Sequence, residues 1–354
     1  MLYHSENQHG GDVYGGGITL DFSANINPLG TPAGVREAAA RALGEMHRYP
    51  DPYCRRLVAA IAAFEQLPED YILCGNGASE LIYACCAALG PTLAAEAAPT
   101  FAEYALALES RGCRVERYLL RRENDFTLDE GFLSFLKEKK PEAVFLCTPN
   151  NPTGRLLPMP LLEQLLQRCA AWGARVFLDE CFLDLTENGV SAKSLLAAHP
   201  ELLILKAFTK SYGMAGLRLG YCLCADGGLL AKMARLTPPW NVSAPAQVAG
   251  EAALTEGDFL EKTRWLIVRE RRWLTRELEA LGLWVCPSQA NFLLLQGPPG
   301  LSAALRQRGI AIRDCGNYHG LEEGWYRIAV RLPEENQRLI TAIRQFCKEK
   351  QLWQ

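Results

Sequence analysis

Between residues 70 and 225 the chain alternates short apolar segments with helical ones, and this alternation restricts the folds that it can adopt. The apolar segments are five to seven residues long, as buried strands commonly are. The helical segment at 159–172 has prolines near its start and Gly173 after its end, which are common helix boundaries. Strands separated by helices form βαβ units, so the sequence predicts an α/β fold with a mainly parallel sheet covered on both faces. The seven expected strands are residues 71–75, 92–97, 114–120, 143–148, 174–180, 202–208 and 218–224.

The domain organisation follows from the length of the chain and from changes in its pattern. A chain of 354 residues is long enough for two domains. Residues 1–30 are rich in glycine and show no repeat, so we expect an arm laid over another part of the molecule. Residues 31–238 contain the predicted sheet and form the expected large domain. Residues 239–354 contain a long helical stretch, three strand-like segments and a closing helix, which predict a smaller C-terminal α+β domain.

Composition narrows the class of protein. Lys and Arg number 37 against 40 Asp and Glu, and the net charge of −3 gives no general attraction to nucleic acid or anionic lipid. The thirteen cysteines lie largely in apolar runs, where free thiols act as small hydrophobic groups. The histidines are scattered, so we expect no metal site. The polar start of the chain and the lack of a long apolar run predict neither a signal peptide nor a membrane span, and favour a reducing cytoplasm.

Polar residues follow the ends of several predicted strands. They are Asn76, the adjacent Asn150 and Asn151, Asp179 and Lys210. In a mainly parallel sheet the carboxyl ends of the strands meet at one edge, where ligands bind. We therefore expect a ligand site at that edge.

The motifs at these strand ends are ambiguous when each is taken alone. The glycine turn GNGASE at 75–80 leads into a helix, so it fits either a phosphate site or an ordinary helix cap. TPNNPTG at 148–154 fits a plain β-turn, but two asparagines at a strand end require hydrogen-bond partners. A buried Asp179 requires a cationic or N–H partner, and a structural ion pair would also satisfy it.

Taken together, the motifs indicate one chemistry. A lysine for a Schiff base, a buried carboxylate for a pyridine nitrogen and an anion cradle are the groups that pyridoxal phosphate requires. NPTG at 151–154, LDE at 178–180, FTK at 208–210 and GLRLG at 216–220 occur in one order along the chain. In these motifs the chain resembles the fold-type I family of pyridoxal-phosphate enzymes, in its aspartate aminotransferase-like branch.

The resemblance implies a role for each matching residue. Lys210 would bind the cofactor covalently, Asp179 would pair with its ring nitrogen, and Asn151 would contact its phenolic oxygen. Tyr49 would reach the cofactor phosphate of a neighbouring subunit, which implies a homodimer with shared active sites. Phe101 would stack on the ring, and the residues expected to hold the cofactor phosphate are Gly77, Ala78, Ser79, Thr209 and Arg218.

Two branches of the family fit best, the threonine-phosphate decarboxylases of cobalamin biosynthesis and the histidinol-phosphate aminotransferases. HGG at 9–11, LDFSANINPLG at 20–30 and the segments 309–321 and 325–336 resemble the decarboxylase branch. Phe182 also favours it, because the aminotransferase branch usually has a tyrosine there. The implied reaction is decarboxylation of L-threonine O-3-phosphate, with L-serine O-phosphate as a second possible substrate. Some transcription factors that sense this cofactor share the fold, but the chain shows no basic stripe.

The decarboxylase pattern also implies substrate contacts. Arg331 would bind the α-carboxylate, a task suited to the forked guanidinium group. Asn151 would contact the substrate as well as the cofactor. The residues implied at the substrate phosphate are Arg313, Asn25 and, from the other subunit, His9 with Gly10.

Overall fold

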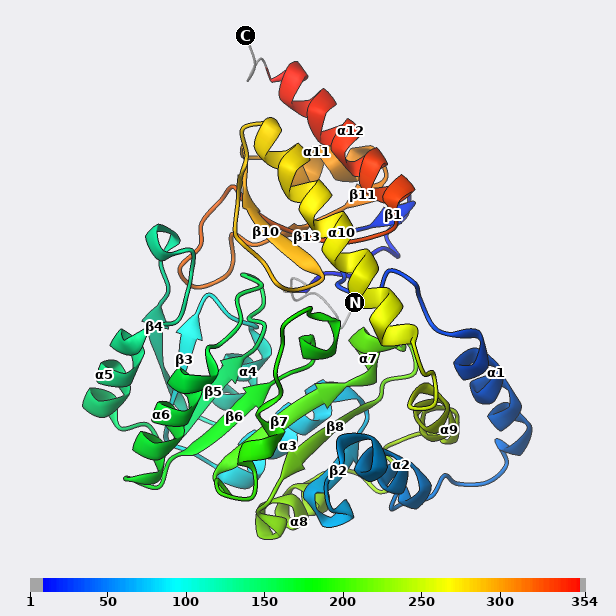
Figure 1. The fold of residues 1–354 in the computed structure, drawn as a ribbon, viewed down its shortest axis with the longest axis vertical. Helices are drawn as coiled ribbons and strands as arrows, with labels where there is room; N and C mark the ends of the chain where they lie inside the picture. The colour runs from blue at the N-terminus through cyan, green and yellow to red at the C-terminus, as the bar shows by residue number, and fades with distance from the viewer. Residues whose placement is uncertain (1–8, 351–354) are drawn as a thin grey trace.

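The computed structural model describes residues 9–350, so residues 1–8 of the expected arm lie outside the described part of the chain. Its largest element is a seven-stranded sheet with the order β2-β8-β7-β6-β5-β3-β4 (Figure 1). Strands β7, β6, β5, β3 and β4 are parallel, whereas β8 runs antiparallel to both of its neighbours. The predicted α/β fold is thereby confirmed. The strands are β2 (Ile72–Gly75), β3 (Leu93–Ala98), β4 (Arg114–Leu119), β5 (Ala143–Cys147), β6 (Arg175–Asp179), β7 (Leu202–Ala207) and β8 (Gly220–Cys224).

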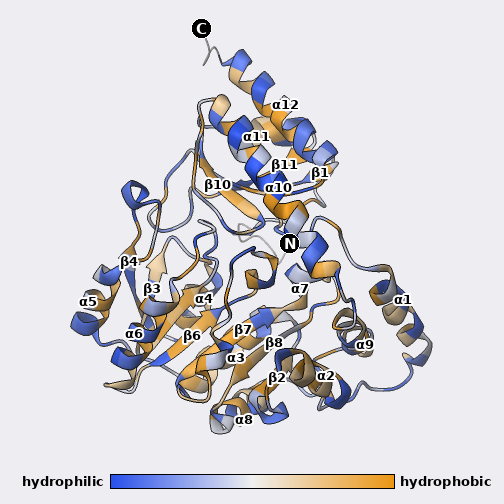
Figure 2. Ribbon diagram, in the orientation of Figure 1, coloured by the Kyte–Doolittle hydropathy of each residue, from blue (hydrophilic) through white to orange (hydrophobic). Residues whose placement is uncertain are grey.

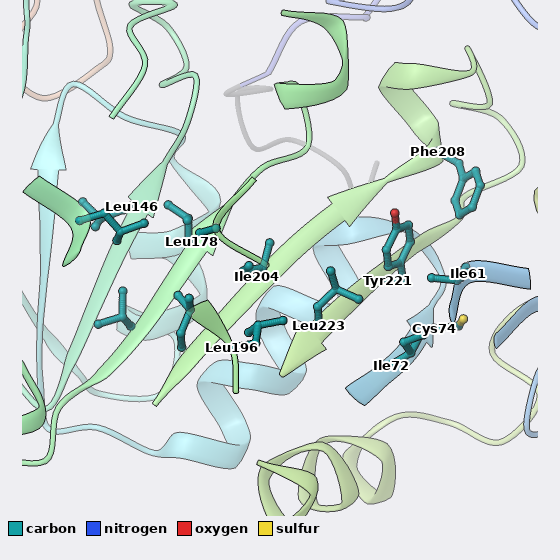
Figure 3. Packing of buried hydrophobic residues seen from close by; sticks show 14 of the residues in the cluster. Ile61, Ile72, Cys74, Leu146, Leu178, Leu196, Ile204, Phe208, Tyr221 and Leu223 are labelled. Atoms are coloured by element: carbon teal, nitrogen blue, oxygen red, sulfur yellow. The ribbon is translucent and has the colours of Figure 1, made fainter. Parts of the chain in front are cut away.

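Both faces of this sheet are covered by helices and buried. Successive residues of a strand point to opposite faces, so each strand contributes side chains to two cores. In β7, Leu202 and Ile204 pack into one core, whereas Leu203 and Leu205 pack into the other. Figure 3 shows part of the first core, where Leu178 and Ile204 of neighbouring strands share a face. The strands are apolar and the outer helices more hydrophilic (Figure 2). The covering helices are α2 (Arg55–Glu65), α5 (Glu130–Lys139) and α6 (Met159–Ala170) on the first face, and α3 (Gly77–Leu89), α4 (Glu103–Glu109) and α8 (Gly227–Leu236) on the second.

A second, four-stranded antiparallel sheet lies at the other end of the molecule, with the order β12-β13-β10-β9 (Figure 1). It shares a separate apolar core with three helices. The elements of this small domain are α10 (Phe259–Ala280), β9 (Trp284–Val285), β10 (Phe292–Gln296), α11 (Leu301–Gln307), β11 (Ile310–Ala311), β12 (Arg313–Asp314), β13 (Trp325–Ala329) and α12 (Pro333–Glu349).

Two segments show where the boundary between the domains lies. Strand β1 (Leu20–Asp21) pairs in parallel with β11, so the end of the arm joins the small domain (Figure 1). Helix α9 (Ala244–Ala253) packs instead against α1 (Ala33–Ala42) and contributes to the large-domain core. We therefore propose that the boundary between the domains lies after α9 rather than at residue 239.

The cysteines and the helices can be compared with the expectations of free thiols and of no membrane span. All thirteen cysteines are buried and free. In the part of the chain that the structure describes, no helix combines the length and the apolarity needed to span a bilayer.

Candidate active site

A cavity of about 300 Å³ lies at the carboxyl ends of the parallel strands, between the two domains. It receives residues from the arm, the start of α3, the loops after β3 and β5, the end of β6 and the short helix α7 (Phe208–Ser211), which follows β7. Strand β13 of the small domain completes it. The predicted site residues that line it are His9, Gly10, Asn25, Ala78, Ser79, Phe101, Asn151, Asp179, Thr209, Lys210 and Arg218.

Lys210 has an unusually acidic ammonium group. Its desolvated position and the nearby guanidinium of Arg327 lower the pKa of Lys210 to about 8, and Cys181 and Asp179 offset the effect only in part. Its Nζ atom lies 5.5 Å from the centre of the Phe182 ring. At neutral pH a useful fraction of Lys210 is therefore the neutral amine, which is the nucleophilic form.

Asp179 is the buried carboxylate at the end of β6, with 5% of its surface exposed. Burial raises its pKa, whereas hydrogen bonds from Cys181 and Tyr104 and the charge of Lys210 lower it. The Tyr104 hydroxyl donates to Oδ2 at 2.6 Å, and the Cys181 backbone N–H donates to Oδ1 at 2.8 Å. Sequence reasoning did not identify Tyr104. Burial raises the pKa of this phenol, which therefore stays protonated and acts as a donor.

The two asparagines of TPNNPTG have different environments. Asn150 is bonded within the protein, to the Pro99 carbonyl and the hydroxyls of Thr100 and Thr153. Asn151 lines the cavity, and its Oδ1 accepts a hydrogen bond from Arg327 Nη1. Asn151 is thus the asparagine that a ligand can contact.

An anion cradle surrounds the start of α3. Gly77 does not line the cavity, but it makes room for the Arg218 side chain, because a Cβ atom at Gly77 would lie 2.6 Å from Arg218 Nη2. Its φ of +79° also favours glycine at this position. Arg218 has a φ of 58°, a conformation that residues other than glycine rarely adopt. Among residues 9–350 no carboxylate forms an ion pair with Arg218. Its charge, with Ser79, Thr209 and the free N–H groups of a helix start, suits a phosphate.

The arginines of the small domain differ from the sequence prediction. Arg331 lies outside the cavity lining and pairs with Glu335 at 2.9 Å. Arg327, four residues earlier, lines the cavity instead. Its Nη2 donates to the Ser23 carbonyl at 2.7 Å, and its buried Nε has no hydrogen-bond partner among residues 9–350. Arg313 is buried beside the site, where Nη2 donates to Asn317 Oδ1 at 2.8 Å.

The remaining predicted residues lie in two places. His9 and Gly10 line the cavity of their own chain, and the expectation that the other subunit supplies them stays a prediction. Asn25 is 2% exposed, and its buried Oδ1 atom has no partner within the described part of the chain. Tyr49 lies away from the cavity with 78% of its surface exposed, and its ring stacks on Trp240 at 4.5 Å.

Comparison with known proteins shows the family of this chain. Residues 18–343 match the family model described as aminotransferase class I and II, so the chain belongs to that family. It is 39% identical to the threonine-phosphate decarboxylase of Salmonella typhimurium, over 92% of this chain and 90% of that protein.

Solved structures from both branches share the fold. The histidinol-phosphate aminotransferase of Clostridium acetobutylicum matches with a TM-score of 0.87 and 27% identity, over 93% of this chain and 99% of the other. The L-threonine-O-3-phosphate decarboxylase of Porphyromonas gingivalis matches with a TM-score of 0.82 and 26% identity, over the same shares of the two chains.

The cofactor of this enzyme is pyridoxal 5′-phosphate, and the residues of the cavity fit it. An acidic lysine, a buried carboxylate and an arginine that forms no ion pair with any described residue are brought to one cavity. Lys210 would hold the aldehyde carbon, Asp179 the ring nitrogen, and Arg218 the phosphate. The aromatic ring of Phe101 lies in the same cavity wall.

Proposed function

We propose that this enzyme decarboxylates L-threonine O-3-phosphate to (R)-1-amino-2-propanol O-phosphate in cobalamin biosynthesis. The observation that carries the proposal is the 39% identity to a threonine-phosphate decarboxylase over nearly the whole of both chains. Similarity of fold does not separate the branches, because structures from both match with TM-scores above 0.8.

Phe182 supports the decarboxylase over the aminotransferase. The histidinol-phosphate branch usually has a tyrosine at this position, whose hydroxyl reaches the cofactor ring. Here Phe182 lines the cavity and packs edge-on against Phe292, with ring centres 5.0 Å apart. It therefore provides an apolar wall beside Lys210 and no hydroxyl group.

Lys210 and Asp179 have separate tasks in the proposed reaction. Pyridoxal phosphate, when bound, withdraws electrons from the bonds of the substrate Cα atom. Asp179 accepts hydrogen bonds from Tyr104 and Cys181, although burial raises the pKa of its carboxyl, and it would pair with the ring nitrogen and favour the protonated form of that nitrogen. The bond from Cα to the carboxylate breaks and carbon dioxide leaves. Lys210 Nζ then delivers a proton to Cα, which its lowered pKa facilitates.

The two anionic ends of the substrate require separate partners. We assign the α-carboxylate to Arg327 in place of Arg331, because Arg327 lines the cavity and its Nε has no partner in residues 9–350. We assign the phosphate to His9 and Gly10 of the arm, Asn25 and the neighbouring Arg313. Asn25 lines the same cavity, and the N–H groups of its side-chain amide are donors suited to a phosphate oxygen.

We also propose that the active enzyme is a homodimer. Tyr49, Met46 and Tyr53 are exposed by 78%, 75% and 69%. Exposed apolar groups gathered in this way are typical of interfaces. Tyr49 would contact the partner's cofactor phosphate across this interface.

A substrate comparison tests the proposed function. The holoenzyme is mixed separately with O-phospho-L-threonine, O-phospho-L-serine and L-histidinol phosphate, with and without 2-oxoglutarate, and carbon dioxide and amine are measured. We expect carbon dioxide from phosphothreonine without a keto acid. One methyl group separates the threonine and serine substrates, a difference commonly worth about 1–3 kcal/mol. Reaction of histidinol phosphate alone, dependent on 2-oxoglutarate, would establish the aminotransferase instead.

A further inference from the structure

Glu103 places a carboxylate in the wall of the cavity for which we propose a substrate with two anionic groups. It lies in the first turn of α4, two residues after Phe101, and its side chain is 14% exposed. Like charges repel strongly when they are shielded from water. A carboxylate in this position would weaken binding of the substrate unless it performs another task.

The contacts of Glu103 indicate that task. Its Oε1 atom lies 2.6 Å from Nε2 of His9, the arm residue assigned above to the substrate phosphate. The hydrogen bond with His9 lowers the pKa of Glu103, and the Tyr83 hydroxyl lowers it further, although burial raises it. The carboxylate is therefore ionised at neutral pH and forms an ion pair whenever His9 is protonated.

The arm has a second attachment close by. The Gly11 N–H donates to Ser23 Oγ at 2.8 Å, and that hydroxyl donates to Asp21 Oδ1 at 2.6 Å. Gly10 lies so close to the Ser23 carbonyl that a Cβ atom would be 2.1 Å from its oxygen. Residues 9–11 are thus fixed at Ser23 on one side and, through the His9 imidazole, at Glu103 on the other.

We propose that Glu103 is a positioning residue, which holds His9 at the cavity so that the imidazole binds the phosphate of the substrate. The inference rests on the proposed phosphorylated substrate. Without this anchor, the glycine-rich arm would have to become ordered when the phosphate binds, and the lost conformational entropy would weaken binding. When His9 is protonated, both ring nitrogens are donors, so Nε2 can donate to Glu103 and Nδ1 to the phosphate, and the positive ring between them offsets the repulsion of the two anions. Glu103 thereby selects phosphorylated over unphosphorylated ligands without touching the phosphate.

Hydrogen exchange tests the anchoring step. The test variant is Glu103→Gln, which keeps the size of the side chain but removes its charge. The matched control is Glu109→Gln in the same helix, since Glu109 pairs with Arg117 at 2.8 Å and does not line the cavity. We expect amide exchange in residues 9–16 to become about tenfold faster in Glu103→Gln, the effect of losing one charged hydrogen bond. The control should exchange in this segment as the wild type does.

Ligand selectivity tests the second step, on the holoenzyme and without turnover. Calorimetry compares (R)-1-amino-2-propanol O-phosphate with unphosphorylated (R)-1-amino-2-propanol. We expect Glu103→Gln to weaken binding of the phosphate ester about tenfold and to leave the free alcohol unchanged. A general loss of structure would weaken both ligands alike. The double variant with His9→Asn should bind the ester no more weakly than the single His9→Asn variant, because Glu103 acts through His9.

The outcomes separate this inference from the proposed function. Unchanged or tighter binding of the ester by Glu103→Gln would overturn the positioning role, whatever the exchange result. Unchanged exchange in residues 9–16 would overturn the anchoring role. If the wild type does not prefer the ester to the alcohol, the proposed substrate class fails and the selectivity role of Glu103 fails with it, whereas faster exchange would still establish the anchor.

Discussion

Two lysines, four residues apart at and just after the end of β7, have opposite chemical characters. Lys206 is buried and lies 2.9 Å from Asp184 Oδ1 and 3.0 Å from Glu65 Oε1. Burial alone would lower its pKa, but these carboxylates raise the pKa of Lys206 above its ordinary value. Lys210 lies near Arg327 and forms no ion pair among the described residues, and its pKa falls to about 8.

The difference shows that burial alone does not determine the pKa of a lysine or its role in the protein. Lys206 is buried and Lys210 is half-buried at the cavity wall, but only Lys206 gains carboxylate partners within ion-pair distance. A compensated charge stays fixed, whereas an uncompensated one readily releases its proton. The groups that surround each lysine therefore place the first in a structural network and the second in a reactive site.

Removal of Lys210 should have the largest effect on activity. In Lys210→Ala no amine remains to hold the cofactor or to deliver a proton, so decarboxylation should fall at least about a thousandfold. The absorbance of covalently bound cofactor should disappear after dialysis, while the thermal unfolding temperature changes little. Retention of the covalent absorbance would refute the assignment of Lys210.

Removal of Lys206 should mainly affect stability. Lys206→Met leaves Glu65 and Asp184 as carboxylates without their shared partner, which costs about 3–5 kcal/mol of unfolding free energy. Urea denaturation measures the loss, and Lys206→Arg should restore most of it. In the wild type the raised pKa of Lys206 makes its contribution complete below the pKa of the unfolded chain, and that contribution is lost as pH rises through the folded-state pKa. A Lys206→Met protein as stable as the wild type would show that the network has no net stabilising effect.

The smallest expected effect is a shift in the pH dependence of cofactor uptake, which reports the pKa of Lys210. Below pH 8 its amine is mostly protonated, so the rate at which the apoenzyme takes up pyridoxal phosphate should rise with pH and level off above about 8. Arg327→Gln removes a nearby positive charge, which should raise the pKa of Lys210 and move the midpoint about one unit higher. Stopped-flow absorbance measures the rate, with Arg331→Gln as the matched control. A midpoint that is the same in all three proteins would exclude Arg327 as a cause of the low pKa.

Local pattern predicted the sheet and the meeting of polar strand-end residues at one cavity. Short apolar runs separated by helices define strands buried on both faces, and residues at the ends of parallel strands meet at one edge of the sheet. For this reason the sequence alone predicts that Asp179, Asn151 and Lys210 lie close together. Each of them belongs to or closely follows the end of a strand, so its position requires no knowledge of distant contacts.

The same reasoning could not distinguish Arg327 from Arg331. Residues four apart in an extended segment point to the same face, so alternation gives both arginines one orientation. The two arginines differ because Arg327 lies within β13, which ends at Ala329, whereas Arg331 lies beyond the strand, shortly before α12 begins. The contacts of Tyr104 with Asp179 and of Glu103 with His9 join residues 75 and 94 positions apart, and no local pattern predicts such pairings.

Because β1 pairs with β11, the residues that line the cavity belong to two structural units. Through this pairing the arm, with Asn25, is joined to the small domain that carries Arg327, while Lys210, Asp179 and Arg218 belong to the large domain. Asn27 lies at the joint, where its side-chain amide donates to the Ser211 carbonyl at 2.7 Å and the Thr263 hydroxyl at 3.0 Å. In the proposed function most substrate contacts come from the arm and the small domain, whereas the cofactor contacts come from the large domain. We therefore expect substitutions in the arm and in β13 to change the preference for amino-acid substrates while the cofactor site stays intact.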